Sequence, residues 1–134
     1  MTTPTPPSGK PARSGKTPLR ILLVDDDKDI REVLGLIIEM DGGVVEYAGN
    51  YYDALSCMES TKLDLVITDY MMPRMHGLYL LDMIKDKKPD LPVIMITAYW
   101  SEDLEAEAKR LGANMLLRKP FEYKVLLDAI RKVL

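Results

Sequence analysis

Apolar runs and amphipathic stretches alternate along the chain from Leu19 to its last residue. Five of the runs are mostly apolar instead of alternating with polar residues, which is typical of strands that a parallel sheet buries on both faces. These predicted strands cover residues 21–24, 44–48, 65–68, 93–97 and 115–117.

Apolar residues at helical spacing follow each predicted strand and indicate five helices, each with one buried face. The residues on these faces are Ile30, Val33, Leu34, Ile37 and Ile38; Tyr51, Ala54, Leu55 and Met58; Leu78, Leu81 and Ile84; Leu104, Ala108 and Leu111; and Val125, Leu126, Ala129, Ile130 and Val133. Asp27 and Asn50 are placed as helix caps, and the glycines at 42–43 and 112 as helix stops. Five strand–helix units in succession predict a doubly wound α/β fold with helices on both faces of one parallel sheet.

Polar side chains stand where several of the predicted strands end. Ligands of open parallel sheets bind outside these carboxyl ends. The ends carry Asp25 and Asp26, then Asp69, then Thr97, then Lys119. Three carboxylates held together in a low dielectric repel one another strongly, so they predict a bound cation. Mg²⁺ suits them, since it binds a few carboxylates together with water and phosphate oxygens.

The same strand ends favour phosphoryl transfer. A lysine supplies a point charge for phosphate oxygens, and a threonine hydroxyl donates a hydrogen bond to one. One of the carboxylates is then available as the nucleophile, which would form an aspartyl phosphate.

Composition narrows the class of protein. The chain has 134 residues, 47% of them hydrophobic and 29% charged, which indicates one ordinary globular domain. A single Cys57 predicts a reduced, cytoplasmic setting, and no apolar run approaches the roughly 18 residues of a membrane span. We therefore expect no membrane partner.

Charge is distributed unevenly. The first twenty residues carry four cations and no acid, so a net charge of −3 for the chain leaves −7 for the remainder. An acidic body argues against direct binding of nucleic acid. Residues 1–18 are basic and rich in Pro, Ser and Thr, and we expect them to be a disordered tail before a domain at 19–134.

Four motifs, each at a strand end and in the same order, are similar to those of the receiver domains of two-component response regulators. They are Leu22-Leu23-Val24-Asp25-Asp26-Asp27, Asp69-Tyr70-Met71-Met72-Pro73-Arg74-Met75 with Gly77, Ile94-Met95-Ile96-Thr97-Ala98, and Gly112-Ala113 followed by Lys119-Pro120-Phe121. The resemblance covers about residues 19–134. It implies a flavodoxin-like (βα)5 fold with a five-stranded sheet of order 2-1-3-4-5.

The resemblance also implies the role of each site residue. Asp69 would accept a phosphoryl group from a phosphohistidine of a sensor histidine kinase or phosphotransfer protein, and a downstream protein would read the result. Asp26 and Asp69 would bind Mg²⁺ directly, Asp25 through water, and the Met71 carbonyl would complete the metal shell. Thr97 would bind a phosphoryl oxygen, Lys119 would pair with it, and the Lys119–Pro120 peptide would be cis. Such a protein is no conventional enzyme, although it promotes its own aspartyl phosphorylation and dephosphorylation.

Two positions depart from the family pattern. Leu116 stands where many members carry an aromatic residue, and His76 stands where an Asp usually precedes the glycine. We expect His76 to be a solvated loop residue, and Tyr99 and Trp100 to lie on the surface. A haloacid-dehalogenase-like phosphatase, which also uses strand-end aspartates, is disfavoured by Asp29 where that family has Thr or Val. A receiver-shaped binding module that is never phosphorylated is the other alternative. Whether the chain acts alone or is part of a longer protein stays open.

Overall fold

The structure is a computed structural model that describes residues 17–72 and 75–134. Its strands are β1 (Arg20–Val24), β2 (Val44–Ala48), β3 (Leu65–Asp69), β4 (Met71–Met72), β5 (Met75–His76), β6 (Val93–Thr97) and β7 (Met115–Arg118). Its helices are α1 (Lys28–Met40), α2 (Tyr51–Ser60), α3 (Gly77–Lys87), α4 (Glu102–Arg110) and α5 (Tyr123–Val133). Most of the tail predicted at 1–18 lies outside the described residues, so the prediction of disorder there stays a prediction.

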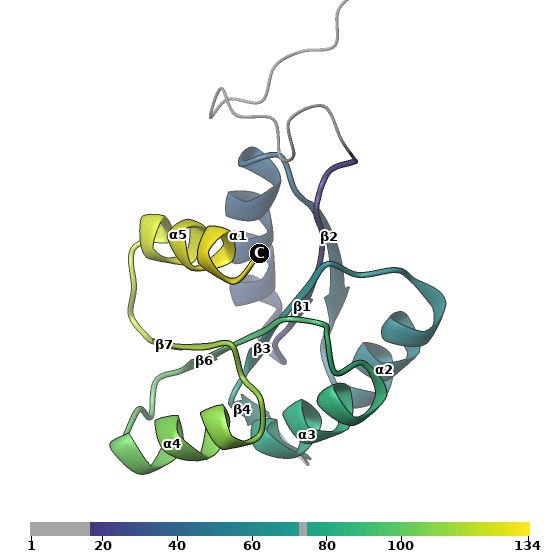
Figure 1. Cartoon of the computed structure of the whole chain (residues 1–134). Helices are drawn as coiled ribbons and strands as arrows, with labels where there is room; N and C mark the ends of the chain where they lie inside the picture. The colour runs from purple at the N-terminus through teal and green to yellow at the C-terminus, as the bar shows by residue number, and fades with distance from the viewer. Residues whose placement is uncertain (1–16, 73–74) are drawn as a thin grey trace, which may run out of the picture.

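Five strands form one parallel sheet in the order β2-β1-β3-β6-β7. This is the predicted 2-1-3-4-5 order, because β6 and β7 are the fourth and fifth strands of the main sheet. Figure 1 shows α1 and α5 on one face of the sheet and α2, α3 and α4 on the other. The predicted flavodoxin-like doubly wound fold is therefore confirmed.

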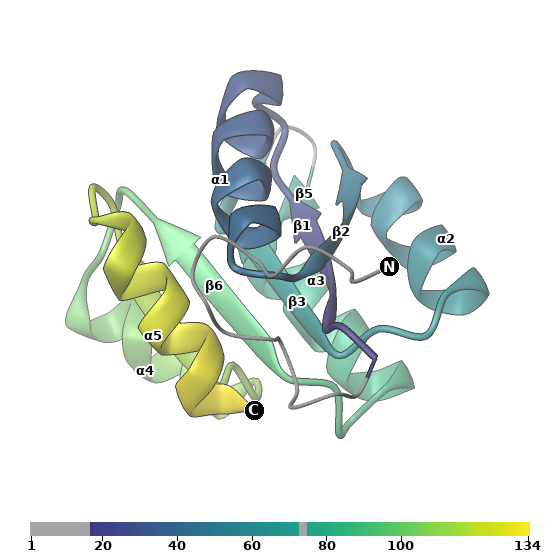
Figure 2. The same cartoon turned by 90° about the horizontal axis from the view of Figure 1, so that it is seen from above.

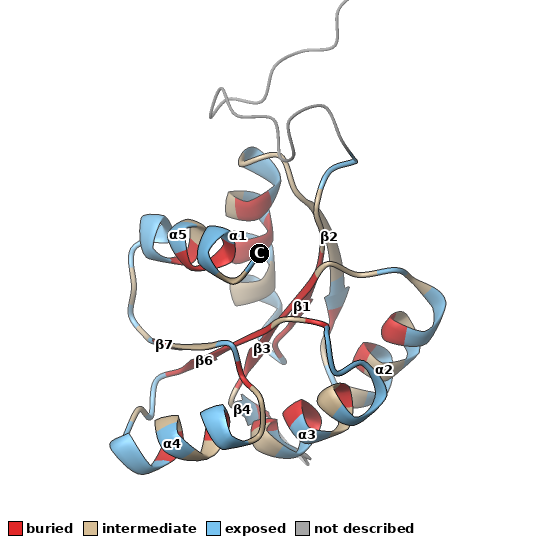
Figure 3. Cartoon of the chain, in the orientation of Figure 1, coloured by how far each residue is buried: buried red, intermediate tan, exposed pale blue. Residues whose placement is uncertain are grey.

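The core divides into two clusters, one on each face of the sheet. Leu22 and Val24 of β1 face the cluster that contains residues of α2, α3 and α4, and Ile21 and Leu23 face the one beneath α1 and α5. Figure 3 shows the central strands as buried, together with parts of the helices, and Figure 2 shows the two helical layers from above. Apolar residues on both faces explain why these strands read as continuous apolar runs.

Short polar residues begin the helices where the sequence pattern places them. Asp27 Oδ1 accepts hydrogen bonds from the amides of Asp29 and Ile30, and Asn50 Oδ1 accepts one from the amide of Asp53. Gly42 and Gly112 both have a positive φ after a helix, which other residues adopt at a steric cost. None of the helices in the described ranges is long and apolar enough to span a membrane.

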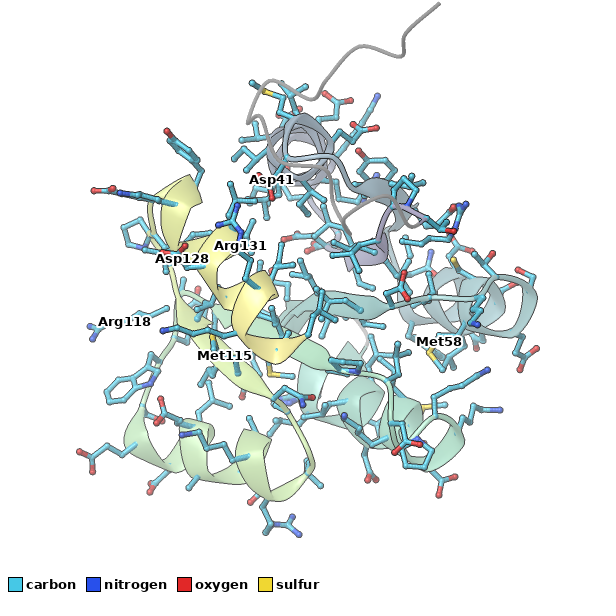
Figure 4. All side chains as sticks on the ribbon, turned by 45° about the horizontal axis from the view of Figure 1, so that its top comes forward. Asp41, Met58, Met115, Arg118, Asp128 and Arg131 are labelled. Carbon is cyan, nitrogen blue, oxygen red and sulfur yellow. The ribbon has the colours of Figure 1, made fainter. Side chains whose placement is uncertain are left out.

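Helices α1 and α5 are joined at the surface as well as through the core. The guanidinium of Arg131 in α5 pairs with Asp41 at the end of α1 at 3.1 Å, and it also reaches Asp128 at 3.3 Å. Figure 4 shows these three side chains gathered between the ends of the two helices.

The structure corrects the predicted burial of two residues and adds one element. Val33 is 60% exposed and Val125 is 45% exposed, although both were expected on buried faces. Each precedes a buried leucine by one position, and a step of 100° around the helix moves it to the edge of the apolar stripe. The added element is the antiparallel pair of β4 and β5. Each of these strands has two residues, which is too short for the alternation of polar and apolar residues to show in the sequence.

Candidate functional site

The predicted site lies at the carboxyl edge of the sheet, where β1 and β3 run side by side. Val24 pairs with Thr68 in the parallel register, so Asp25 and Asp69 follow at the same level of adjacent strands. One oxygen each of Asp25, Asp26 and Asp69 lies within 4.8 Å of the others. Asp25 and Asp69 are buried, whereas Asp26 is exposed. The three carboxylates thus form one cluster that is open to solvent on the Asp26 side.

Lys119 brings a positive charge to this cluster. Its ammonium lies 3.4 Å from Asp69 Oδ2 and 3.6 Å from Asp25 Oδ2. The Lys119 amide donates a hydrogen bond to the Thr97 carbonyl at 2.7 Å, which fixes the chain beyond β7 against the end of β6. The Lys119–Pro120 peptide is cis, as expected.

Burial governs the ionisation of the two inner carboxyl groups. The pKa of Asp25 is raised from 3.8 to about 6, mainly by burial and in smaller part by the charges of Asp69 and Asp26, against a hydrogen bond from the Asp27 amide and the charge of Lys119. Burial also raises the pKa of Asp69, opposed by Lys119 and by hydrogen bonds from the backbone amides of Met71 and Tyr70. The site therefore holds negative charge that its own residues neutralise only in part.

The donor set fits Mg²⁺. Among the described residues, Asp25 Oδ2 is the buried side-chain oxygen that has no hydrogen-bond donor, and its carboxylate partner Oδ1 accepts from the Asp27 amide at 2.9 Å. A buried carboxylate oxygen without a hydrogen-bond donor lowers the stability of the fold unless a cation or a water molecule contacts it. Carboxylates with access to solvent are the ligands that Mg²⁺ uses, because it retains several of its waters.

Thr97 and Met71 occupy two further sides of the site. Thr97 is fully buried at the end of β6, and its hydroxyl oxygen accepts a hydrogen bond from the Tyr99 amide at 2.9 Å. Met71 lies in β4 with a half-exposed side chain, and its backbone amide lowers the pKa of Asp69. Gly77 closes this loop, since a Cβ there would lie 2.6 Å from the Tyr70 carbonyl oxygen.

His76, Tyr99 and Trp100, which were all expected to be exposed, lie in different environments. His76 is exposed, as expected, but it lies in β5 instead of a loop, and its Nε2 is 3.1 Å from the Tyr70 hydroxyl. Tyr99 is 66% exposed. Trp100 is half-buried instead of free on the surface: its indole N–H donates to Glu105 at 3.0 Å, and the Arg118 guanidinium lies 5.4 Å from the ring centre.

Sequence reasoning missed the backbone donors and one cation of the site. The amides of Tyr70 and Met71 carry no signal in the sequence, because every residue except proline has one. Arg31 donates to the backbone carbonyl of Asp25 at 2.7 Å, and its position six residues beyond Asp25, on the first turns of α1, is the only trace of this contact. Asp27 Oδ1 caps α1, which argues against a role for Asp27 as the second acid of a phosphatase pair.

Comparison with known proteins agrees with this geometry. The family model of the response regulator receiver domain matches residues 21–131. The response regulator protein FleR of Pseudomonas aeruginosa is 38% identical over 113 residues, and the response regulator MprA of Mycolicibacterium vanbaalenii is 37% identical over 117. These alignments cover 84% and 87% of this chain but 24% of FleR and 51% of MprA. The chain thus spans between a quarter and half of the length of these relatives.

Solved structures of receiver domains share the fold. A CheY-like response regulator receiver domain protein of Methanospirillum hungatei has a TM-score of 0.83 at 31% identity, over 87% of this chain and 93% of that one. The response regulator protein TrrA of Thermotoga maritima, solved in complex with Mg²⁺ and BeF, has a TM-score of 0.79 at 33% identity, over 87% of this chain and 99% of that one. The chain belongs to the family of response regulator receiver domains, the phosphoacceptor domains of two-component signalling.

Proposed function

We propose that Asp69 is the phosphoacceptor and that Asp25, Asp26, Asp69 and the Met71 carbonyl hold the Mg²⁺ that the transfer requires. The observation that carries the proposal is the placement of Asp69: its carboxylate lies beside the buried Asp25, whose Oδ2 has no hydrogen-bond donor, and the Lys119 ammonium is 3.4 Å from Asp69 and 3.6 Å from Asp25. This environment offers a nucleophile together with charges for both sides of a phosphoryl group.

Each residue has a separate task in the transfer. An Asp69 oxygen attacks phosphorus of the donor, the bond from phosphorus to the donor's imidazole nitrogen breaks, and the imidazole keeps that electron pair. Mg²⁺, when bound, neutralises charge on the transferring phosphoryl oxygens. Lys119 pairs with one of these oxygens, and Thr97, whose hydroxyl hydrogen is not used in its bond from the Tyr99 amide, donates to another.

The expected partners follow from the family. Receiver domains of response regulators interact with histidine kinases and with downstream targets. For this chain we propose a sensor histidine kinase or a phosphotransfer protein as donor and a downstream protein as the reader, in the cytoplasm and without direct binding to nucleic acid. The remainder after residue 20, with its formal charge of −7, supports a protein reader over nucleic acid.

Intact-mass measurement after incubation with acetyl phosphate and Mg²⁺ tests the proposal. The wild-type chain should gain one phosphoryl mass, EDTA should prevent the gain, and Asp69→Asn should abolish it. Asp82→Asn removes an exposed acid from α3 and should label normally. Labelling that persists in Asp69→Asn would refute the assignment, and an unlabelled wild type would favour the binding module that is never phosphorylated.

A further inference from the structure

The guanidinium of Arg31 lies against the turn that carries the first two acids of the site. Its Nη1 donates a hydrogen bond to the Asp25 carbonyl oxygen at 2.7 Å, from a half-buried position on α1. A hydrogen bond from a charged donor is stronger than one between neutral groups. Within the described part of the chain, Arg31 forms no hydrogen bond or ion pair with the carboxylates of Asp25 and Asp26, so it acts on the backbone between them.

That backbone connects the two acids rigidly. The Asp25 carbonyl and the Asp26 amide belong to one planar peptide. A group that fixes the orientation of the carbonyl therefore also fixes the orientation of the Asp26 amide. The other side of Asp25 is held as well, because its amide donates to the Ala48 carbonyl at 3.1 Å. The backbone amide and carbonyl of Asp25 are thus both held, the amide by the Ala48 carbonyl and the carbonyl by the side chain of Arg31.

Gly49 leaves the space that the guanidinium occupies. A Cβ at Gly49 would lie 2.9 Å from Arg31 Nη1 and 3.6 Å from Cζ, with no other atom of the described chain nearer than these. Its φ is not in the left-handed region, which among the described glycines is reserved for Gly42 and Gly112. The backbone of residue 49 would therefore accept an alanine, and the side chain would collide only with Arg31.

We propose that Arg31 is a positioning residue of the metal site, and that the missing side chain of Gly49 lets it reach the Asp25 carbonyl. The inference rests on the proposed function, because it assumes that Asp25 and Asp26 bind Mg²⁺. Lys119, not Arg31, is the cation whose charge lowers the pKa of Asp25. Arg31 therefore serves the site through the geometry of the peptide rather than by neutralising the acids.

Mg²⁺ titration of four single variants and one double variant tests the proposal. Arg31→Ala should raise the Kd for Mg²⁺ about 10-fold or more, as loss of a group that orients metal ligands typically does. Gly49→Ala should weaken binding in the same direction, and it should have no further effect when Arg31→Ala is already present. Arg31→Lys keeps the charge and one donor and should recover part of the affinity. Lys28→Ala removes an exposed cation from the same turn of α1 and should leave Kd within about 2-fold, since exposed charges are screened.

Amide and carbonyl chemical shifts of the metal-free protein provide a readout that does not depend on Mg²⁺. The Asp25 carbonyl and the Asp26 amide should shift in Arg31→Ala and in Gly49→Ala, and should not shift in Lys28→Ala. An unchanged Kd in Arg31→Ala overturns the proposal, as does an equal loss in Lys28→Ala. An effect of Gly49→Ala that is independent of Arg31 overturns the role given to Gly49. A wild type that binds no Mg²⁺ defeats the proposed function itself, and is recognised before any variant is compared.

Discussion

The carboxyl and amino edges of the sheet differ in how far their charged and polar groups are paired within the protein. At the carboxyl edge, three carboxylates lie within 4.8 Å of one another, one ammonium faces two of them, and a buried oxygen of Asp25 has no donor. At the amino edge, the side chains of Lys85 and Asn114 are hydrogen-bonded within the protein. Lys85 donates to the Leu91 carbonyl at 2.8 Å and to Asn114 Oδ1 at 3.0 Å.

Asn114 shows how complete the pairing at the amino edge is. Its Oδ1 accepts from Lys85 and also from the amide of Val93, the first residue of β6, at 2.9 Å. Burial lowers the pKa of Lys85, and the two oxygens that it bonds compensate for part of that desolvation. The side chain of Asn114 thus links the start of β6 to the end of α3 through hydrogen bonds.

The difference indicates what each edge is for. The polar groups named at the amino edge are hydrogen-bonded within the protein, so they stabilise the fold and are not available to bind a ligand. The carboxyl edge keeps charges that the protein alone does not neutralise, which lowers stability in the metal-free state and favours binding of a cation. This contrast leads to three predictions about substitutions and one about pH.

The largest effect is expected at Asp25. Asp25→Asn removes a buried charge, and a pKa of about 6 against 3.8 corresponds to about 3 kcal/mol, so the metal-free variant should be more stable than wild type by up to that amount near pH 7.5. Chemical denaturation with EDTA present measures this difference. With saturating Mg²⁺ the difference in stability between the variant and wild type should become smaller or change sign, since only wild type retains all the proposed metal ligands. A metal-free variant less stable than wild type would contradict the view that this edge carries uncompensated charge.

The pH dependence of the same comparison has a definite sign. Because the folded pKa of Asp25 is raised, the folded state holds its proton more tightly, and the stability that this contributes is present below pH 3.8 and lost as pH rises towards about 6. The advantage of Asp25→Asn over wild type should therefore be small near pH 4 and reach its full size above about pH 6. Denaturation of both proteins across this range measures it. A constant difference at all pH values would show that titration of Asp25 is not its source.

An intermediate effect is expected at the amino edge. Asn114→Ala leaves the Val93 amide without its acceptor at a fully buried residue, which should cost about 1 to 3 kcal/mol of unfolding free energy. Asn114→Asp keeps an acceptor oxygen beside Lys85 and should lose less. The Kd for Mg²⁺ should not change in either variant. A weakened Mg²⁺ site would mean that the two edges are energetically coupled.

Sequence could predict the carboxyl edge because the rule that locates it is geometric. Carboxyl ends of parallel strands meet at one edge, so Asp25, Asp69 and Lys119 were expected together, and the order of the five main strands followed from the resemblance. The contact of Arg31 with the Asp25 carbonyl could not be predicted, because backbone acceptors are the same at every position. The network of Asn114 is hidden for a similar reason, since an asparagine between a helix stop and a strand is typical of any loop.

The smallest effect is expected for the ion pair between Arg20 of β1 and Glu46 of β2. Their side chains are 40% and 33% exposed at a separation of 2.5 Å, and exposed pairs contribute about 0 to 1 kcal/mol. Arg20→Gln should therefore reduce the unfolding free energy by less than about 1 kcal/mol, and less at high salt, because screening weakens the pair in wild type. The backbone bond from the Arg20 amide to Asp64 at 2.8 Å does not need the guanidinium and should persist. Denaturation at low and high salt, with Glu46→Gln and the double variant completing the cycle, isolates the pair. A coupling well above 1 kcal/mol that survives high salt would show a desolvated pair, and the amino edge would then contain charge as strongly coupled as that of the carboxyl edge.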